Sequence, residues 1–159
     1  MPSGTAHARL EIGFLVILAV PAMVLGVIRG WWTETEVAAF AFSYAFSMVF
    51  LSPDLDLQDS AASHRWGPLR WLWMPYALAF RHRRASHHPL WGPLGRIVYL
   101  GILAAAVGFI VLLVGHRAAP RISLRWTVAV AIVVGVYLPN LLHIAADRLH
   151  SAWRRRRRL

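Results

Sequence analysis

The chain has 159 residues, of which 58% are hydrophobic, and it contains eight Trp and no Cys. This composition argues against a small soluble globule, and the lack of cysteine excludes disulfides, thiolate metal sites and thiol catalysis. All 17 basic residues are Arg and seven acids oppose them, so the formal net charge is +10. A membrane protein is the class that fits, and any metal site in it must be built from His and carboxylate side chains.

The first apolar segment, residues 12–28, is followed by a second one at residues 37–51. Thr33 to Glu36 has the spacing of a capping box, which predicts the start of the second helix, and Ser52-Pro53 predicts its end. The second segment is shorter than the roughly 20 residues that cross a bilayer core, so it needs neighbouring helices or local thinning of the bilayer. Asp54 then lies just beyond a helix end.

Residues 66–80 read WGPLRWLWMPYALAF, an aromatic stretch that is too short to cross a membrane. We predict an interfacial or re-entrant segment here, with its tryptophans at the level of the lipid headgroups. Two further apolar segments, residues 97–114 and 126–146, are each near the length of a membrane span. The sequence therefore predicts an all-α, polytopic membrane protein with about four transmembrane helices. We expect a single helical membrane domain over residues 1–150 and a basic C-terminal tail over residues 151–159.

The arginines predict the orientation of these spans. With four spans both termini share a side, and that side carries thirteen of the arginines whereas the other carries four. Positive charge collects on the cytoplasmic side, so we expect both termini and the long middle segment in the cytoplasm. The run Arg154 to Arg158 predicts attraction to anionic lipid headgroups, and no nucleic-acid partner is expected.

Nearly all histidines and most acids fall on this predicted cytoplasmic side. His143 and Asp147 in HIAAD are four residues apart and so share one face of a helix, and His7 and Glu11 repeat this spacing. Asp54 and Asp56 are two apart in an extended or turn segment, so both can face one ion or bridge two. The set on this side is His7, Asp54, Asp56, Asp59, His64, His82, His87, His88, His143, Asp147 and His150.

Imidazole and carboxylate ligands together suit Zn, Fe, Mn or Mg, and mixed sites of this kind usually leave a position for water. A metal-bound water can attack an ester or phosphoryl centre while the metal polarises the bond that breaks. Two ions would need bridging carboxylates, which Asp54, Asp56 and Asp147 can supply. Arg83 and Arg84 are natural partners for a phosphate group.

Each of these motifs also has a structural interpretation. An Asp-Leu-Asp sequence near arginines is typical of a solvated loop with surface ion pairs, and a single HxxxD is typical of a hydrogen-bonded helix end. We interpret His88, His116 and His150 as structural or surface residues. The sequence leaves three roles open for Glu11, which can be a metal ligand, a proton acceptor or an ion-pair partner of Arg9. The convergence of PDLD, HRxxSH and HxxxD on one membrane face favours the metal site, because ionisable groups near lipid are costly.

The stretches MPSGTAH, SPDLDL, HRWGPLRWLWMPY and HRRASHHPLWGP, with the following RIVYL, resemble a group of small membrane metal-binding proteins. These are similar in turn to the YdjM-like membrane-bound metal-dependent hydrolases of prokaryotes, whose pattern runs PDxD, HRxxTHS and HxxxD. The resemblance covers most of residues 1 to 150. It implies a metal-ligand set of His7, Asp54, Asp56, His82, His87, His143 and Asp147, with a looser claim for His64.

The resemblance also implies an activity. It predicts a hydrolase in the cytoplasmic (inner) membrane that acts on a phosphoester, a phospholipid or a similar lipid-like substrate, with one or two divalent ions, zinc foremost. Arg83 or Arg65 would neutralise the phosphate, and Ser86 keeps a hydroxyl before His87 although the serine after the histidine is absent. The alternative is a non-catalytic metal-binding membrane protein with a structural, regulatory or ion-handling role. The nearly apolar span centres, apart from Ser43, Ser47 and Asn140, weaken the case for ion transport.

Overall fold

The computed structural model describes residues 4–57, 59–79, 88–115 and 123–157, and every regular element in this part of the chain is helical. The all-α prediction is therefore confirmed for the described residues. In chain order the elements are α1 (Gly4–Phe14), the π-helix η1 (Leu15–Ala19), α2 (Val20–Ile28), α3 (Glu34–Phe50), the 3₁₀-helix η2 (Pro53–Asp56), α4 (Ala61–His64), the 3₁₀-helix η3 (Gly67–Trp73), α5 (Met74–Ala79), α6 (Trp91–Gly115) and α7 (Trp126–Arg156).

Among the described residues, three helical stretches are long and apolar enough to cross a membrane: His7–Ile28, Trp91–Gly115 and Trp126–Arg154. The prediction of about four spans is wrong at the second segment. This segment forms α3, whose 17 residues rise about 25 Å, less than the roughly 30 Å of a bilayer core. Two glutamates in its first turn shorten the apolar part further.

The predicted boundaries of α3 are confirmed. The Thr33 hydroxyl accepts a hydrogen bond from the Glu36 backbone at 3.4 Å, and the Glu36 carboxylate accepts one from the Thr33 backbone at 2.8 Å. This capping box satisfies donors that the first turn of a helix leaves free. At the other end the helix stops at Phe50, three residues before Pro53.

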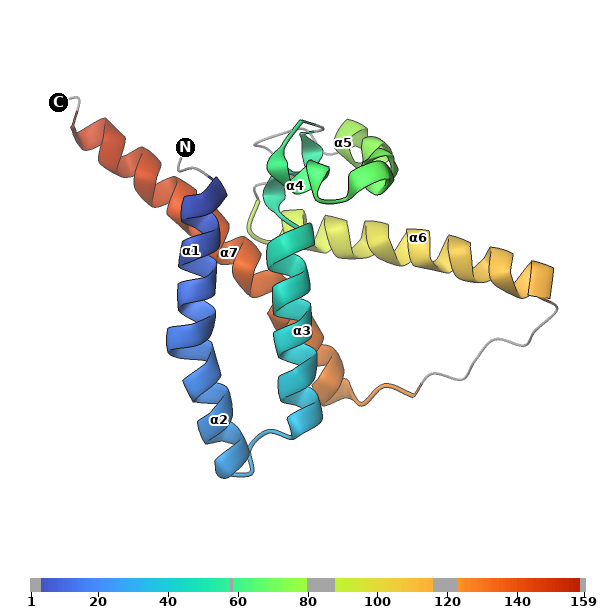
Figure 1. Cartoon of the computed structure of the whole chain (residues 1–159), viewed down its shortest axis with the longest axis horizontal. Coiled ribbons are helices and arrows are strands. Elements are labelled where there is room, and N and C mark those ends of the chain that lie inside the picture. The colour runs from blue at the N-terminus through green and yellow to red at the C-terminus, as the bar shows by residue number, and fades with distance from the viewer. Residues whose placement is uncertain (1–3, 58, 80–87, 116–122, 158–159) are drawn as a thin grey trace.

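Figure 1 shows α1 and α2 running side by side with α3, while α7 passes behind both and brings the two termini to the same end of the molecule. The most extensive contact is that of α3 with α7. It is close because Gly135 carries no side chain: a Cβ there would meet the Ser43 hydroxyl and lie 2.7 Å from the Phe40 carbonyl oxygen. Small residues allow this kind of close helix approach.

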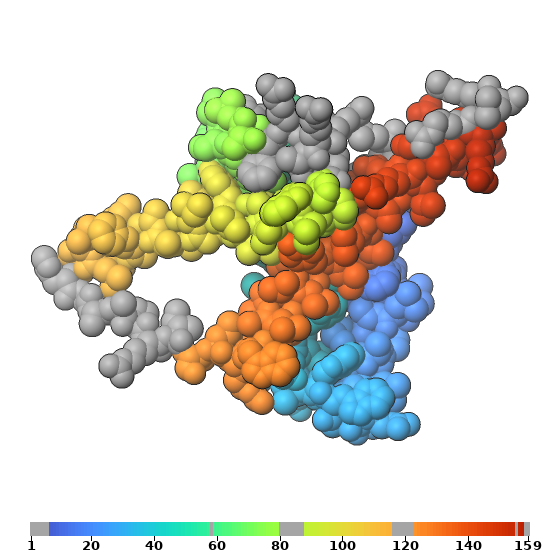
Figure 2. Space-filling model, turned by 180° about the vertical axis from the view of Figure 1, so that it is seen from behind, coloured from blue at the N-terminus to red at the C-terminus, as the bar shows by residue number. Residues whose placement is uncertain are grey.

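The helix α6 runs crosswise to the others and projects away from them, which is visible from both sides in Figures 1 and 2. Its first turns are anchored by Arg96, whose side chain has no solvent exposure. The guanidinium donates from Nη1 to the Leu51 carbonyl at 2.8 Å and from Nε to the Gly92 carbonyl at 3.0 Å. Arg96 thereby fastens α6 to the C-terminal end of α3.

The Trp-rich segment forms η3 and α5, which pack beside the end of α3 as an aromatic cluster. Trp73 and Tyr76 are 2% and 1% exposed, and their rings meet edge to face at 5.5 Å. Trp66 donates from Nε1 to the Phe50 carbonyl at 2.9 Å. Part of this segment therefore forms the core of the protein, while Trp71 stays exposed. Its position at a membrane interface remains a prediction.

The last helix begins at Trp126, where the apolar pattern predicts it, and continues well beyond residue 146 to Arg156. It thus passes without interruption through residue 150, the predicted border between the membrane domain and the basic tail. Pro139 lies inside this helix. A proline there removes one hydrogen bond from the helical ladder and favours a bend.

Candidate metal site

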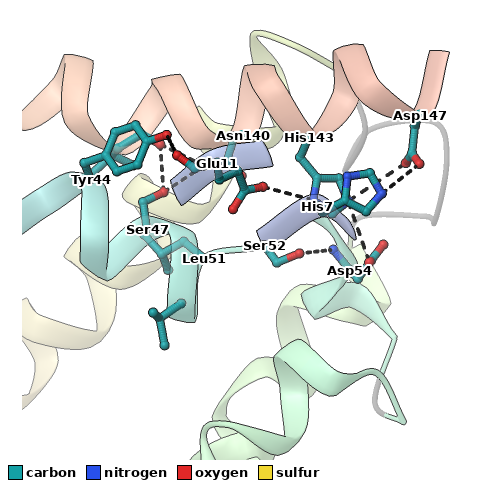
Figure 3. A network of polar contacts seen from close by, with 12 residues as sticks. His7, Glu11, Tyr44, Ser47, Leu51, Ser52, Asp54, Asn140, His143 and Asp147 are labelled. Atoms are coloured by element: carbon teal, nitrogen blue, oxygen red, sulfur yellow. Dashed lines mark hydrogen bonds and ion pairs between the residues drawn. The ribbon is translucent and has the colours of Figure 1, made fainter. Parts of the chain in front are cut away.

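Two histidine rings from opposite ends of the sequence stack against each other. His7 lies on α1 and His143 on α7, and their ring centroids are 3.9 Å apart with an angle of 14° between the planes. The residues are 5% and 6% exposed. Figure 3 shows the two rings between α1, α7 and the turn that carries Asp54.

Three carboxylates that the structure describes surround these rings. The Asp147 Oδ1 atom lies 3.2 Å from His7 Nε2, and Asp147 Oδ2 lies 3.9 Å from His143 Nε2. The Glu11 carboxylate lies 3.4 Å from His143 Nδ1, and the Asp54 carboxylate lies 3.8 Å from His143 Nε2. His7, Glu11 and His143 are buried, whereas the Asp54 side chain is 35% exposed, and a divalent cation would offset the charge of carboxylates gathered at one point.

The donor atoms fit a metal. Within the described residues, His7, His143 and Asp147 form a group whose possible ligand atoms all lie within 4.8 Å of one another. His7 Nδ1 is buried and has no hydrogen-bond partner in the described part of the chain, while Asp147 Oδ1 has only the contact with His7 Nε2. Buried polar atoms are nearly always paired, so an unpaired ring nitrogen in such a cluster indicates room for an ion or ordered water.

Local hydrogen bonds fix the Asp54 turn. The Ser52 hydroxyl accepts from the Asp54 backbone nitrogen at 3.5 Å, and the Ser60 hydroxyl donates to the Asp54 carbonyl oxygen at 2.7 Å. Pro53 occupies the first turn of η2, where its fixed φ suits a helical start. The 3₁₀ turn therefore presents Asp54 toward α7 with little backbone freedom.

A layer of hydrogen bonds next to the rings ties α1, α3 and α7 together. The Tyr44 hydroxyl donates to the Glu11 carbonyl at 2.8 Å, which connects α3 to α1. The Ser47 hydroxyl donates to the Val136 carbonyl at 2.8 Å and accepts from Asn140 Nδ2 at 2.9 Å, which connects α3 to α7. These bonds hold the two histidine-bearing helices at a fixed separation (Figure 3).

A cavity of about 60 Å³ opens beside the rings. Its wall includes His7, Glu11, Asp54, His143, Asn140 and Arg65. The Asn140 Oδ1 atom is buried and accepts no hydrogen bond from any residue that the structure describes. A polar cavity of this size has space for a few waters.

The structure brings together His7, Asp54, His143 and Asp147 from the predicted ligand set. His82, His87, Arg83 and Ser86 lie outside the described residues. His64 is exposed on α4, where its Nδ1 atom lies 3.4 Å from Arg70 Nη1. Asp56 is 8% exposed and interacts electrostatically with Arg96. The roles of His64 and Asp56 as ligands remain predictions.

His88 Nδ1 accepts hydrogen bonds from the Leu90 and Trp91 backbone at 3.2 Å each, which supports its interpretation as a structural residue. Glu11, which the sequence leaves open, belongs to the cluster. The spacing of four residues between His7 and Glu11 is the sequence feature that could have placed Glu11 in this cluster. Asn140 had no comparable signal, because an amide in an apolar helix does not identify its neighbours.

A family model described as "Uncharacterized metal-binding protein (DUF2227)" matches residues 2–157. A protein of Aquifex aeolicus (strain VF5), described as "Uncharacterized protein", is 44% identical over 61 residues, which is 38% of this chain and 43% of that protein. The match thus spans less than half of this curated relative. No solved structure matches the chain.

Proposed function

The chain belongs to the family described as "Uncharacterized metal-binding protein (DUF2227)", and from this membership we propose that it holds a divalent metal ion between α1, η2 and α7. The observation that carries the proposal is the stacked pair His7 and His143 with Asp147 at its edge, because these residues offer buried donor atoms to one point. Glu11 and Asp54 adjoin the pair and supply further oxygen ligands.

Two imidazoles and carboxylates are the ligand set of many catalytic zinc sites and of non-haem iron sites. Zinc is our first expectation, with manganese, iron and magnesium as alternatives, and one or two ions per chain. His82 and His87 join the proposed set through the HRxxSH motif.

The metal proposal is tested on the full chain purified in detergent. Elemental analysis should find about stoichiometric divalent metal, and His143→Ala and Asp147→Asn should each lower the content at least fivefold. His150→Ala is the matched control, since this histidine lies on the same helix with its ring against Trp153. Unchanged metal in both site variants would contradict the proposal.

We place the protein in the cytoplasmic membrane of a prokaryote, with the metal site and both termini toward the cytoplasm. Three helices of sufficient length support the membrane placement, and the uneven distribution of the arginines supports the orientation. Because His7 on α1 contacts Asp147 on α7, both termini lie at one end of the molecule, so α3 has to return the chain across the bilayer beside α1 and α2 although it is short for a span. The run of arginines at the C-terminus would then meet anionic headgroups.

A second step of the proposal is hydrolysis of a phosphoester or phospholipid. The specific observation that favours it over a structural, regulatory or ion-handling role is the cavity beside the rings, because a closed structural site leaves no such space. A divalent metal bound by His7, His143 and Asp147 would supply a water of lowered pKa and would polarise a phosphoryl group. Asn140 Oδ1 can orient a water in the cavity, and Arg65 can pair with a phosphate oxygen.

The activity is tested with metal-loaded protein on a panel of phosphodiesters and phospholipids, with and without chelator. Arg65→Gln should lower turnover at least tenfold at unchanged metal content, because Arg65 lines the cavity without belonging to the ligand cluster. Arg29→Gln is the control, because this exposed arginine follows the C-terminal end of α2 and does not line the cavity. The absence of chelator-sensitive turnover on any substrate would favour the non-catalytic alternative.

A further inference from the structure

A second, larger cavity lies at the end of the helices opposite to the metal site. It has a volume of about 680 Å³ and is bounded by the end of α1, η1, α2 and the turn after it, the first half of α3 and the first half of α7. Phe14, Met23, Phe40, Val130 and Leu138 are among the residues that line it. This volume lies within the range of roughly 300 to 1,000 Å³ that small-molecule sites occupy.

The cavity has the length of one lipid leaflet. Along α7 its lining runs from Trp126 to Leu138, and twelve helical residues rise about 18 Å. Half of a bilayer core measures roughly 15 Å. Ala19, Ala22 and Ala131 also line it, and their short side chains leave the space between the helices open.

Polar and aromatic groups gather at the outer end of the cavity. Trp31 and Trp126 line it there and are 67% and 76% exposed, which suits tryptophans at headgroup depth. Glu36 and Thr127 line the same end, and Arg125, which does not itself line the cavity, directly precedes Trp126 and attracts the Glu36 carboxylate. One acidic and one basic residue therefore lie close to the point where the apolar lining ends.

We propose that this cavity binds one acyl chain of a membrane phospholipid whose ammonium-bearing, zwitterionic headgroup rests at Glu36 and Arg125. The apolar wall packs against the acyl chain, the glutamate carboxylate pairs with the ammonium group and the arginine guanidinium pairs with the phosphate. The occupant comes from the leaflet opposite to the metal site. This binding site is independent of the proposed metal chemistry, because the two cavities share no lining residue.

The test uses the full chain in vesicles of phosphatidylethanolamine and phosphatidylglycerol that contain a trace of phosphatidylethanolamine with a photoreactive acyl chain. After irradiation, mass spectrometry should locate the label on α2 and the first half of α7. Ala22→Phe and Ala131→Phe fill the cavity and should each lower this labelling at least fivefold. Val133→Phe is the matched control, because Val133 is 48% exposed on the same helix and does not line the cavity.

Glu36→Gln tests the headgroup, since glutamine can keep the capping box while the charge is lost. It should lower the preference for the ethanolamine probe over a glycerol probe severalfold. Metal content and the melting temperature are measured for every variant, so a folding defect or a failure of the metal site is seen separately. Unchanged labelling in both alanine variants, equal labelling along exposed α6, or cross-links between two copies at the cavity would overturn the proposal.

Discussion

Arg96 is a charged side chain buried within an otherwise apolar helix of 25 residues. Burying a charge costs several kcal/mol unless hydrogen bonds and opposite charges offset it. Arg96 donates to the carbonyl of Leu51, which is the C-cap residue of α3. At this end of a helix the backbone acceptors lack helical partners and the helix dipole is negative. Asp56 and Asp54 add electrostatic attraction. Arg96 therefore fixes the junction between the C-terminal end of α3 and the turn that carries Asp54.

Replacing this arginine tests its structural role. Arg96→Met should lower the free energy of unfolding by about 3 kcal/mol, because the carbonyl of Leu51 and the carboxylate of Asp56 lose a buried partner. Arg96→Lys keeps the charge and should cost about half as much. Thermal unfolding followed by tryptophan fluorescence in detergent measures both variants. A methionine variant as stable as the parent chain would contradict this account.

Several site residues could be predicted because their signal is local. The spacing of His143 and Asp147, and of His7 and Glu11, places each pair on one helix face, and both pairs lie in the cluster. The partners of each pair could not be predicted from spacing. The contact of Tyr44 with Glu11 joins residues 33 apart, and that of Arg96 with Leu51 joins residues 45 apart. Such contacts depend on how the helices pack.

The contact between α3 and α7, called the seam here, holds the helix that carries His143 against α3, and the bond from Tyr44 to the Glu11 carbonyl holds α1, which carries His7, to the same helix. The seam combines the close approach at Gly135 with the bonds from Ser47 and Asn140. The capping box at Thr33 and the proline at residue 53 predicted both ends of α3. The apolar residues between these ends also suggested a full-length membrane span, for which α3 is too short. The buried Ser43, Tyr44 and Ser47 show instead that one face of α3 is committed to protein contacts.

Two glycine substitutions compare this seam with an open helix face. Gly135→Ala should lower the free energy of unfolding by about 1 to 3 kcal/mol, because the new methyl group meets the backbone of α3, which cannot rotate away. Gly101→Ala on α6 should leave stability unchanged or raise it by up to about 1 kcal/mol. A Cβ at Gly101 meets no described atom within 4 Å. Melting temperatures of the pair provide the measurement, and equal losses would argue against a tight seam.

The whole molecule has two chemically different ends. The termini and helices α4 and α5 lie toward one end of the molecule (Figure 1), and the candidate metal site and the aromatic cluster belong to this end. The apolar cavity with its tryptophans is lined by the opposite halves of α3 and α7. In the proposed membrane placement, the orientation of the chain decides which compartment the candidate metal site faces. The distribution of the arginines predicts this orientation. The crosswise path of α6 could not be predicted from the sequence, because its apolar residues can pack against many different surfaces.

Reporter fusions test this polarity. A fluorescent protein at the C-terminus should be bright and a periplasmic phosphatase at the same position inactive, because arginine-rich flanks stay in the cytoplasm. Replacing Arg154 to Arg158 with glutamine should raise the fraction of inverted molecules severalfold. An active phosphatase on the unaltered chain would reverse the assignment.

Pro139 separates α7 into two limbs, since Leu138 borders the apolar cavity and Asn140 borders the metal cavity. The proline nitrogen cannot donate to the carbonyl four residues earlier, so the helix is softest at this joint. In the proposed membrane placement, a thicker or thinner bilayer would tilt the part of α7 before Pro139, and the helix would bend at the proline. His143 lies one turn beyond Pro139, so such a bend would change the spacing between its ring and that of His7.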